Sequence, residues 1–153
     1  MKIINADIRD AVNKLWYHYV VHQCNCTSKT AHGVAPLLFD IYPEAHYLKN
    51  PDREFGTFQI FENPKFRTKL INIYTQRIPG AARYHSEYTD RLRAFRDVLT
   101  KIPFGAGATV ALPYQIGCGL AKGNWLDYEG ILLDVEEELS KSGVEFTLFR
   151  LKK

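Results

Sequence analysis

The sequence predicts an α/β fold: a three-layer α/β/α sandwich with a mixed, mainly parallel central sheet. Segments of strand and helix character alternate through most of the chain, and the strand candidates are rich in β-branched and aromatic residues. The length of 153 residues suits one compact domain, so we expect a single domain over 1–153. The composition, 46% hydrophobic and 24% charged, is that of ordinary globular proteins and argues against disorder or a fibrous repeat.

The first third of the chain predicts two strands, a loop and a helix. A short strand is expected at 2–5, and a longer buried strand at 16–24, a run of β-branched and aromatic residues without Gly or Pro. This second strand ends at Asn25, where small and polar residues predict a loop. An apolar helix is expected over 34–42, because Pro43 follows it.

The middle of the chain predicts a hairpin, a helix and a central strand. Strand candidates at 56–61 and 69–74 flank a turn-like segment and predict an antiparallel pair. Apolar residues recur every three or four positions over 86–100, which predicts an amphipathic helix. A Gly-Ala-Gly turn then leads into 108–112, which predicts a short central strand.

The end of the chain predicts one more helix and one more strand. Asn124 is a good N-cap for a helix whose apolar face extends to Leu139, and Gly143 supplies its stop. Residues 144–151 alternate between two faces, which predicts the last strand.

Two loops that each follow a strand and precede a helix predict a binding site. Ligands of α/β sheets bind beyond the carboxyl ends of the strands, so the amides of loops 25–34 and 112–121 are expected to face one crevice. Gly117 and Gly119 lack Cβ atoms, and free N–H groups in such a turn can bind an anion such as a pyrophosphate. A tight turn without a ligand explains these glycines equally well. The pattern is neither a P-loop nor a dinucleotide-binding fingerprint.

Asn25 and His22 lie at the mouth of the second strand. The amide of Asn25 can hydrogen-bond ribose hydroxyl groups, or it can simply cap its own turn. His22 can act as a general acid, a general base or an orienting group near neutral pH, although a histidine paired within the core is the commoner arrangement. We expect no metal site, because His18 and His22 are too far apart along their strand and no third ligand is evident.

The composition favours a soluble, cytoplasmic protein. The formal net charge of +3 mildly favours an anionic ligand and gives no nucleic-acid signature. The sequence lacks an apolar run of the ~18 residues that cross a bilayer, and its first residues include acidic ones where a secretory signal is apolar. We therefore expect no membrane contact and, by default, a monomer. Cys24, Cys26 and Cys118 are expected to be small buried residues in a reducing compartment.

A series of short motifs runs through nearly the whole chain. In chain order they are Val21 to Cys26, Gly33 to Ala35, Phe39 to Pro43, Pro113, Ile116 to Leu120, and Asn124 with Trp125. Together they resemble the motifs of the macro domain superfamily, and most closely those of the small branch that includes ADP-ribose 1''-phosphate phosphatases and ADP-ribosyl-protein hydrolases. The resemblance implies a three-layer α/β/α sandwich that binds ADP-ribose in a cleft over the strand ends, without a cofactor.

The resemblance also assigns residues to parts of the ligand. Asp7, with Ile8 beside it, matches the aspartate that receives the adenine amino group, and Phe149 matches an aromatic residue against adenine. A turn acid and a core aromatic explain Asp7 and Phe149 equally well. His22 matches the histidine implicated in the phosphatases, and Asn25 would hold the distal ribose. The ligand loops contain Lys29, Thr30, Ala31, Gly33 and Val34 in the first, and Gln115, Ile116, Gly117, Cys118, Gly119 and Leu120 in the second.

The chain departs from the family pattern at positions that matter for catalysis. Family members that remove ADP-ribose from glutamate use a lysine on a central strand and an aspartate after the second loop, and this chain has Gln76 and Ala121 there. Neither side chain can do that chemistry, which argues against this glycohydrolase activity. Ala31 and His32 stand where the family commonly has glycines, so we expect a differently shaped first loop.

We therefore predict binding of ADP-ribose and hydrolysis of the terminal phosphate of ADP-ribose 1''-phosphate, with His22 and Asn25 in the catalytic site. Two alternatives remain open: a non-catalytic reader of ADP-ribose or of ADP-ribosylated protein, and a hydrolase of another 1''-linked or O-acyl ester of ADP-ribose. No nucleic-acid partner is expected, because the arginines near the helix at 86–100 alternate with acids and predict its solvated face. These arginines are Arg83, Arg91, Arg93 and Arg96.

Overall fold

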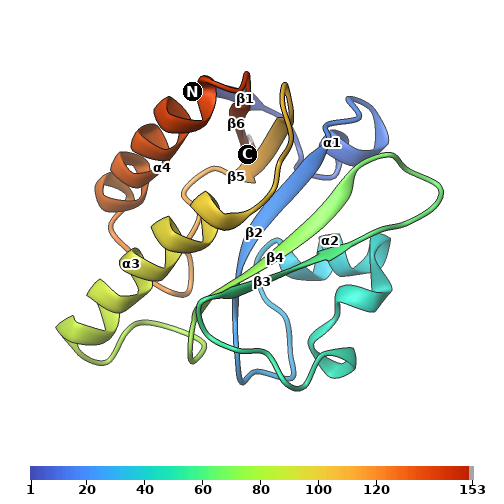
Figure 1. The fold of residues 1–153 in the computed structure, drawn as a ribbon. Helices are drawn as coiled ribbons and strands as arrows, with labels where there is room; N and C mark the ends of the chain where they lie inside the picture. The colour runs from blue at the N-terminus through green and yellow to red at the C-terminus, as the bar shows by residue number, and fades with distance from the viewer. Residues whose placement is uncertain (152–153) are drawn as a thin grey trace.

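The computed structural model describes residues 1–151, whose strands and helices Figure 1 shows. The strands are β1 (Lys2–Asn5), β2 (Tyr19–Asn25), β3 (Thr57–Phe61), β4 (Lys69–Gln76), β5 (Thr109–Pro113) and β6 (Glu145–Arg150). The α-helices are α1 (Asp10–Asn13), α2 (Ala35–Ile41), α3 (His85–Lys101) and α4 (Trp125–Ser140), and the 3-10 helices are η1 (Pro43–Ala45) and η2 (Tyr47–Lys49).

The strands form one sheet in the order β1-β6-β5-β2-β4-β3. Every neighbouring pair is parallel except β3 and β4, which form the predicted antiparallel pair. Helices α3 and α4 pack on one face of the sheet, and α1 and α2 pack on the other (Figure 1). The predicted α/β class, with a mixed, mainly parallel sheet between two helical layers, is therefore confirmed.

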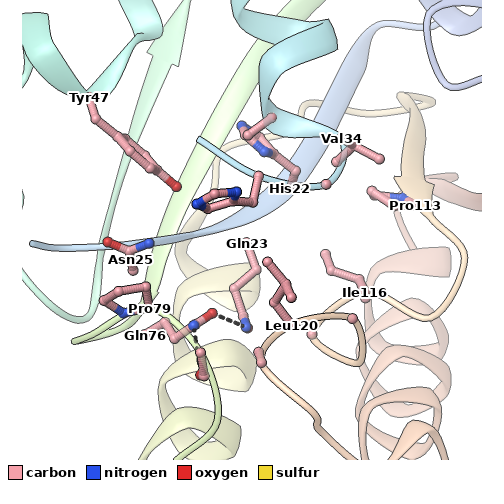
Figure 2. A pocket seen from close by; sticks show the side chains of 17 residues that line it. His22, Gln23, Asn25, Val34, Tyr47, Gln76, Pro79, Pro113, Ile116 and Leu120 are labelled. Atoms are coloured by element: carbon pink, nitrogen blue, oxygen red, sulfur yellow. Dashed lines mark hydrogen bonds between the residues drawn. The ribbon is translucent and has the colours of Figure 1, made fainter. Parts of the chain in front are cut away.

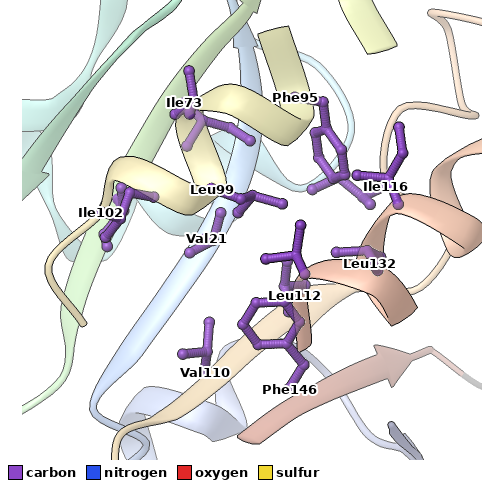
Figure 3. Close-up of a cluster of buried hydrophobic side chains, with 14 of the residues drawn as sticks. Val21, Ile73, Phe95, Leu99, Ile102, Val110, Leu112, Ile116, Leu132 and Phe146 are labelled. Carbon is purple, nitrogen blue, oxygen red and sulfur yellow. The ribbon is translucent and has the colours of Figure 1, made fainter. Parts of the chain in front are cut away.

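An apolar layer is buried on each face of the sheet. Strand β2 shows the cause, because its side chains alternate: Val21 faces α3 and α4, whereas Val20 and Cys24 face α1 and α2. In the larger cluster, Phe95 of α3 and Leu132 of α4 pack onto the central strands (Figure 3). Close packing on both faces fixes the positions of the strand ends, and therefore the points at which the loops leave the sheet.

The three helices that the sequence predicts are present as α2, α3 and α4, within a residue or two of their expected bounds. Asn124 caps α4 as predicted, because its Oδ1 accepts a hydrogen bond from the N–H of Leu126 at 3.0 Å. Within residues 1–151, no helix combines the length and apolar character that crossing a membrane requires.

The structure corrects two predicted strand boundaries. β2 begins at Tyr19 rather than at residue 16, because Trp16 takes a left-handed conformation with φ of 52° and leaves its side chain exposed. β4 continues past residue 74 to Gln76, since its parallel pairing with β2 extends the ladder to Asn25. The sequence did not predict α1, η1 and η2, because three or four residues are too few to show a period.

The structure also corrects the prediction for the arginines of α3. Arg93 and Arg96 lie near the surface and pair with Asp90 and Asp134. Arg91, by contrast, is only 1% exposed, because its guanidinium finds backbone carbonyl groups inside the protein. Charge alternation cannot reveal such a residue, since a long side chain can leave the polar face of a helix.

Gly130 gives a first testable prediction. It lies on the exposed side of α4, and no atom lies within 4 Å of the place where a Cβ would stand. Gly130→Ala is expected to raise the free energy of unfolding by about 0.5–1 kcal/mol, because glycine loses more backbone entropy in a helix. Urea denaturation measures this change, and a lower midpoint for the variant would contradict it.

Candidate functional site

A cavity with a volume of ≈ 230 Å³ opens where β2, β4 and β5 end (Figure 2). These strands are parallel neighbours, so the loops after their carboxyl ends meet at one edge of the sheet. Three loops and η2 contribute to the wall. The lining residues are His22, Gln23, Asn25, His32, Gly33, Val34, Ala35, Tyr47, Gln76, Pro79, Gly80, Pro113, Ile116, Gly117, Gly119, Leu120 and Ala121.

The structure brings together the two loops that the sequence predicted would share a crevice. Gly33 and Val34 line the cavity from the first loop, and Ile116, Gly117 and residues 119–121 line it from the second. In Figure 2, Ile116 and Leu120 lie across the cavity from Asn25. The predicted juxtaposition of the two loops is therefore found, while their binding of a ligand stays a prediction.

Several backbone amides of these loops have no hydrogen-bond partner. In the second loop, the N–H groups of Gly119, Leu120 and Ala121 donate to no acceptor within residues 1–151. The N–H groups of Gly33 and Val34 in the first loop are likewise unpaired within this part of the chain. Each of the five residues lines the cavity. Such amides carry partial positive charge and suit an anion.

The conformation of the second loop is fixed from within. Gln115 and Lys122 bracket the loop in left-handed conformations, with φ of 58° and 54°. A non-glycine residue in this region costs of order 1–2 kcal/mol, so the surrounding bonds must hold it. One of these bonds is the 2.9 Å contact from the N–H of Gly123 to the carbonyl of Gly117. Contacts within the loop therefore support this backbone conformation.

His22 lies on β2 at the inner end of the cavity and is only 1% exposed. Its Nε2 lies 2.6 Å from Oδ1 of Asn72. The amide nitrogen of Asn72 donates to the carbonyl of Ala45, so its oxygen faces the imidazole and Nε2–H is the donor. Burial lowers the pKa of His22 to about 4, against a smaller opposing effect of the Asn72 hydrogen bond. The imidazole is therefore neutral at neutral pH, and its partner is an amide rather than an acid.

The side chain of Asn25 caps its own turn and still lines the cavity. Its Oδ1 accepts hydrogen bonds from the N–H groups of Thr27 and Ser28 at 3.2 and 2.8 Å. Its Nδ2 donates to no acceptor within residues 1–151 and lies on the cavity side (Figure 2). The two uses of this residue that the sequence left open, a turn cap and a ligand contact, are thus compatible.

The side chain of Gln76 is held by hydrogen bonds within the protein and connects β4 to the loop that follows it. Its Nε2 donates to the carbonyls of Ile78 and Gly80 at 3.0 and 3.3 Å, and its Oε1 accepts from Nε2 of Gln23 at 2.9 Å. Gln23 in turn accepts from the hydroxyl of Thr75 at 2.8 Å. The hydrogen-bonding capacity of Gln76 is largely used within the protein, so it shapes the wall at this end.

The loop after β4 is the part of the site that the sequence reasoning missed. Pro79 and Gly80 line the cavity, as do Gln23 and Tyr47. The sequence contains part of the information needed to find this loop. If β4 is recognised as a second parallel neighbour of β2, the loop after β4 must lie at the same edge of the sheet. The sequence predicts this strand only as the hairpin partner of β3. Nothing in the sequence pattern indicated Tyr47, which lies on a three-residue helix.

Several predicted ligand residues do not line the cavity. Asp7 pairs with Arg9 at 2.6 Å, and the hydrogen bond from Arg9 holds the pKa of its carboxyl below the usual value. Ile8 and Phe149 are buried in the core, where Phe149 packs edge-on against Tyr17. Their roles as adenine contacts stay predictions. The other predicted residues outside the lining are Lys29, Thr30, Ala31, Gln115 and Cys118.

The described lining contains no carboxylate, lysine, arginine or cysteine. Among residues 1–151, His, Cys, Asp and Glu form no group of three or more that could hold a metal ion. Of the cysteines, only Cys24 is fully buried as predicted, whereas Cys26 and Cys118 are partly exposed. Burial raises the pKa of Cys24 to about 12 and that of Cys118 to about 11, so neither is a thiolate at neutral pH. The chemistry at this site therefore depends on amides and neutral side chains.

Comparisons with known proteins identify relatives of the chain. No protein-family model matches it. An uncharacterised 17.5 kDa protein from the tk-vs intergenic region of Enterobacteria phage T4 is 32% identical over an alignment of 126 residues, and this alignment covers 74% of this chain and 76% of that protein.

Solved structures share the fold over nearly the whole chain. The macrodomain of Mycobacterium tuberculosis DarG aligns with a TM-score of 0.71 at 18% identity and covers 99% of this chain and 97% of its own. The macrodomain of Thermus aquaticus DarG aligns with a TM-score of 0.68 at 14% identity, with coverage of 97% and 96%. This chain therefore belongs to the same family as the phage T4 protein, and its fold is that of a macro domain.

Proposed function

We propose that the cavity binds ADP-ribose or a close derivative through its diphosphate and distal ribose. The observation that carries this proposal is the set of unpaired amides that two loops present to one cavity. No cationic side chain is among the described lining residues, so these amides would neutralise the diphosphate, while the free Nδ2 of Asn25 would donate to a ribose hydroxyl. The resemblance of both loops to those of macro domains supports the same ligand.

The sheet order provides a path for the rest of the ligand. A volume of ≈ 230 Å³ is below the roughly 300–1,000 Å³ of a complete small-molecule site, so the cavity would enclose only part of ADP-ribose. β6 and β1 continue the same edge beyond β5, with Pro113 in register with Phe149 and Asn5 with Arg150. The adenosine half would extend over these strand ends towards Asp7, whose carboxylate can accept a hydrogen bond from the adenine amino group.

Gly119 allows a direct test of ligand class and place. A Cβ at this position meets no atom within 4 Å, so Gly119→Val would place its methyl groups beside the unpaired amides without a backbone clash. By calorimetry we expect wild-type protein to bind ADP-ribose and the variant to bind it at least ~10-fold more weakly, because the diphosphate loses close approach to the backbone.

The matched control for this test is Gly130→Ala, which lies on α4 outside the cavity lining and should keep wild-type affinity. Adenosine, which has no diphosphate, should bind far more weakly than ADP-ribose. Equal affinity of the wild type and Gly119→Val for ADP-ribose would rule out this cavity as the diphosphate site.

Hydrolysis of the terminal phosphate of ADP-ribose 1''-phosphate is a second candidate function. It is favoured by the presence of His22 and Asn25 in one cavity. In this reaction water would attack phosphorus and give a proton to the neutral His22, and the bond from phosphorus to the 1''-oxygen would break. The imidazolium of His22 would return the proton to that oxygen, and ADP-ribose and inorganic phosphate would leave. The absence of any acid from the described lining favours the alternative, a non-catalytic reader of ADP-ribose or of ADP-ribosylated protein.

One assay separates these two functions. Release of inorganic phosphate from ADP-ribose 1''-phosphate is measured for the wild type and for His22→Ala, alongside the affinity of each for ADP-ribose. A hydrolase predicts release that His22→Ala abolishes while the affinity stays nearly unchanged. Binding without release from this or another 1''-linked ester supports the reader, and equal release by both proteins refutes a role of His22 in turnover.

A further inference from the structure

A buried arginine holds the first loop from behind. Arg53 is 9% exposed and donates four hydrogen bonds, all to backbone carbonyl groups. Its Nε bonds Asn25 at 2.9 Å and its Nη2 bonds Ser28 at 2.7 Å, while its Nη1 bonds Tyr47 and Asn50 at 3.1 and 2.8 Å. Its guanidinium also lies 4.1 Å from the centre of the Tyr47 ring. Arg53 therefore ties the end of β2 and the loop after it to η2.

A second buried arginine holds the loop after β4. Nη1 of Arg91 donates to the carbonyl of Gly80 at 2.9 Å, and its Nη2 donates to that of Ile78 at 3.4 Å. Nε2 of Gln76 donates to the same two carbonyls, so each oxygen accepts two hydrogen bonds. A carbonyl oxygen has two lone pairs, and both are used here. The backbone on either side of Pro79 is therefore fixed at two points.

These two loops are also joined to each other. The N–H of Cys26, after β2, donates to the carbonyl of Arg77, after β4, at 3.3 Å. A shift of either loop would strain this bond. The two walls that Arg53 and Arg91 hold thus form one connected unit on one side of the cavity.

The chemistry of these contacts points to a role beyond general stability. Burying a guanidinium is costly unless its donors are satisfied, and a carboxylate is the usual partner. Arg53 forms no ion pair within residues 1–151, and the carboxylate that pairs with Arg91, that of Glu87, stands 3.7 Å away. Both guanidiniums bond loop carbonyls instead, through Nε, Nη1 and Nη2 of Arg53 and through Nη1 and Nη2 of Arg91, whose buried Nε has no partner within residues 1–151. Lysine cannot replace them, because an ammonium lacks the planar fork that reaches several carbonyls at once.

We propose that Arg53 and Arg91 are positioning residues that hold the cavity walls in the ligand-binding conformation before a ligand arrives. Neither side chain lines the cavity, so both act through the loops. Walls that are ordered in advance lose little conformational entropy on binding, which strengthens affinity. The inference rests on the proposed function only for the identity of the ligand.

The test uses Arg53→Lys and Arg91→Lys, each made in the Gly130→Ala background to offset lost stability. Calorimetry with ADP-ribose, at a temperature where each protein is fully folded, should give a dissociation constant at least ~10-fold weaker and a less favourable binding entropy. Val144→Ala in the same background is the matched control. Val144 is buried just before β6, at the opposite end of the strands, so this variant loses stability and should keep its affinity.

Hydrogen exchange of two amides tests the same inference without a ligand. The N–H of Ser28 bonds Oδ1 of Asn25, and the N–H of Cys26 bonds Arg77. Both should be protected in the ligand-free wild type and the Val144→Ala control, and should exchange at least ~10-fold faster in the lysine variants.

Three outcomes separate this inference from the proposed function. Dissociation constants of the lysine variants equal to that of Val144→Ala would overturn the inference while leaving ADP-ribose binding intact. Unprotected amides in the ligand-free wild type would also overturn it, even where a variant fails to fold. A wild type that shows the protection and binds no ADP-ribose would refute the proposed function alone.

Discussion

Gly117→Ala is expected to lower the free energy of unfolding by about 3 kcal/mol and to weaken ligand binding with it. The residue has φ of 80°, a left-handed conformation that costs alanine about 1–2 kcal/mol. A Cβ at this position would stand 2.6 Å from Cζ of Tyr128, whose ring is fully buried. Forcing a methyl group into a packed core adds about 1–3 kcal/mol. The ring cannot move away easily, because it packs edge-on against Phe95 at 4.9 Å between ring centres.

Gly119→Ala is the matched control for this prediction, since it has open space for a Cβ in the same loop. Urea denaturation of the two variants and the wild type measures the difference. Alanine at 119 should leave the unfolding midpoint within error of the wild type. Equal unfolding midpoints for Gly117→Ala and Gly119→Ala would contradict this prediction. They would show that the loop and Tyr128 adjust to the added methyl group without a loss of stability.

Acidification below pH ~6.5 is expected to destabilise the protein by about 3 kcal/mol in total through His22, beginning above the pH range in which carboxylates titrate. The pKa of this residue is about 4 in the folded protein and about 6.5 in the unfolded chain. Between these values the unfolded chain binds a proton that the folded protein does not. Stability is therefore full above pH ~6.5 and falls as the pH drops towards 4, by up to ~1.4 kcal/mol per pH unit.

The free energy of unfolding measured from pH 7.5 to 4.5 tests this dependence. His22→Gln, which does not titrate, should show a flatter profile than the wild type even though its stability at pH 7.5 is lower. Gly130→Ala, which changes no titratable group, should shift the whole profile and keep the wild-type slope. Parallel profiles for the wild type and His22→Gln would contradict the buried, neutral state of His22.

The sequence predicted the fold well because its signals were local and repeated. The apolar face of α4 and its Asn124 cap, for example, are both determined by residues that lie close together in the sequence. The alternation along β6 likewise placed Phe146 and Phe149 on opposite faces, where the two core clusters contain them. In the site, the same reasoning found the two loops, since each showed the pattern of a strand, small residues and a helix.

The rest of the site could not be predicted because it depends on contacts distant in the chain. The partner of His22 is Asn72, fifty residues away, and only the pairing of β2 with β4 brings them together. Arg91 belongs to a helix with a charged face, yet it turns inward to carbonyls eleven and thirteen residues before it. Spacing within a helix carries no information on such a contact.

Gln76 and Arg91 donate to the same two carbonyl groups, and this sharing limits how the chemistry of the cavity could change. A lysine at position 76 would bring an ammonium group to the two carbonyls that the guanidinium already occupies, in a place with little water to separate the like charges. Gain of a lysine there would require the loss of Arg91 at the same time. A protein that carried only one of these two changes would be less stable than the present one. Replacement of Gln76 by lysine in single steps is therefore unfavourable.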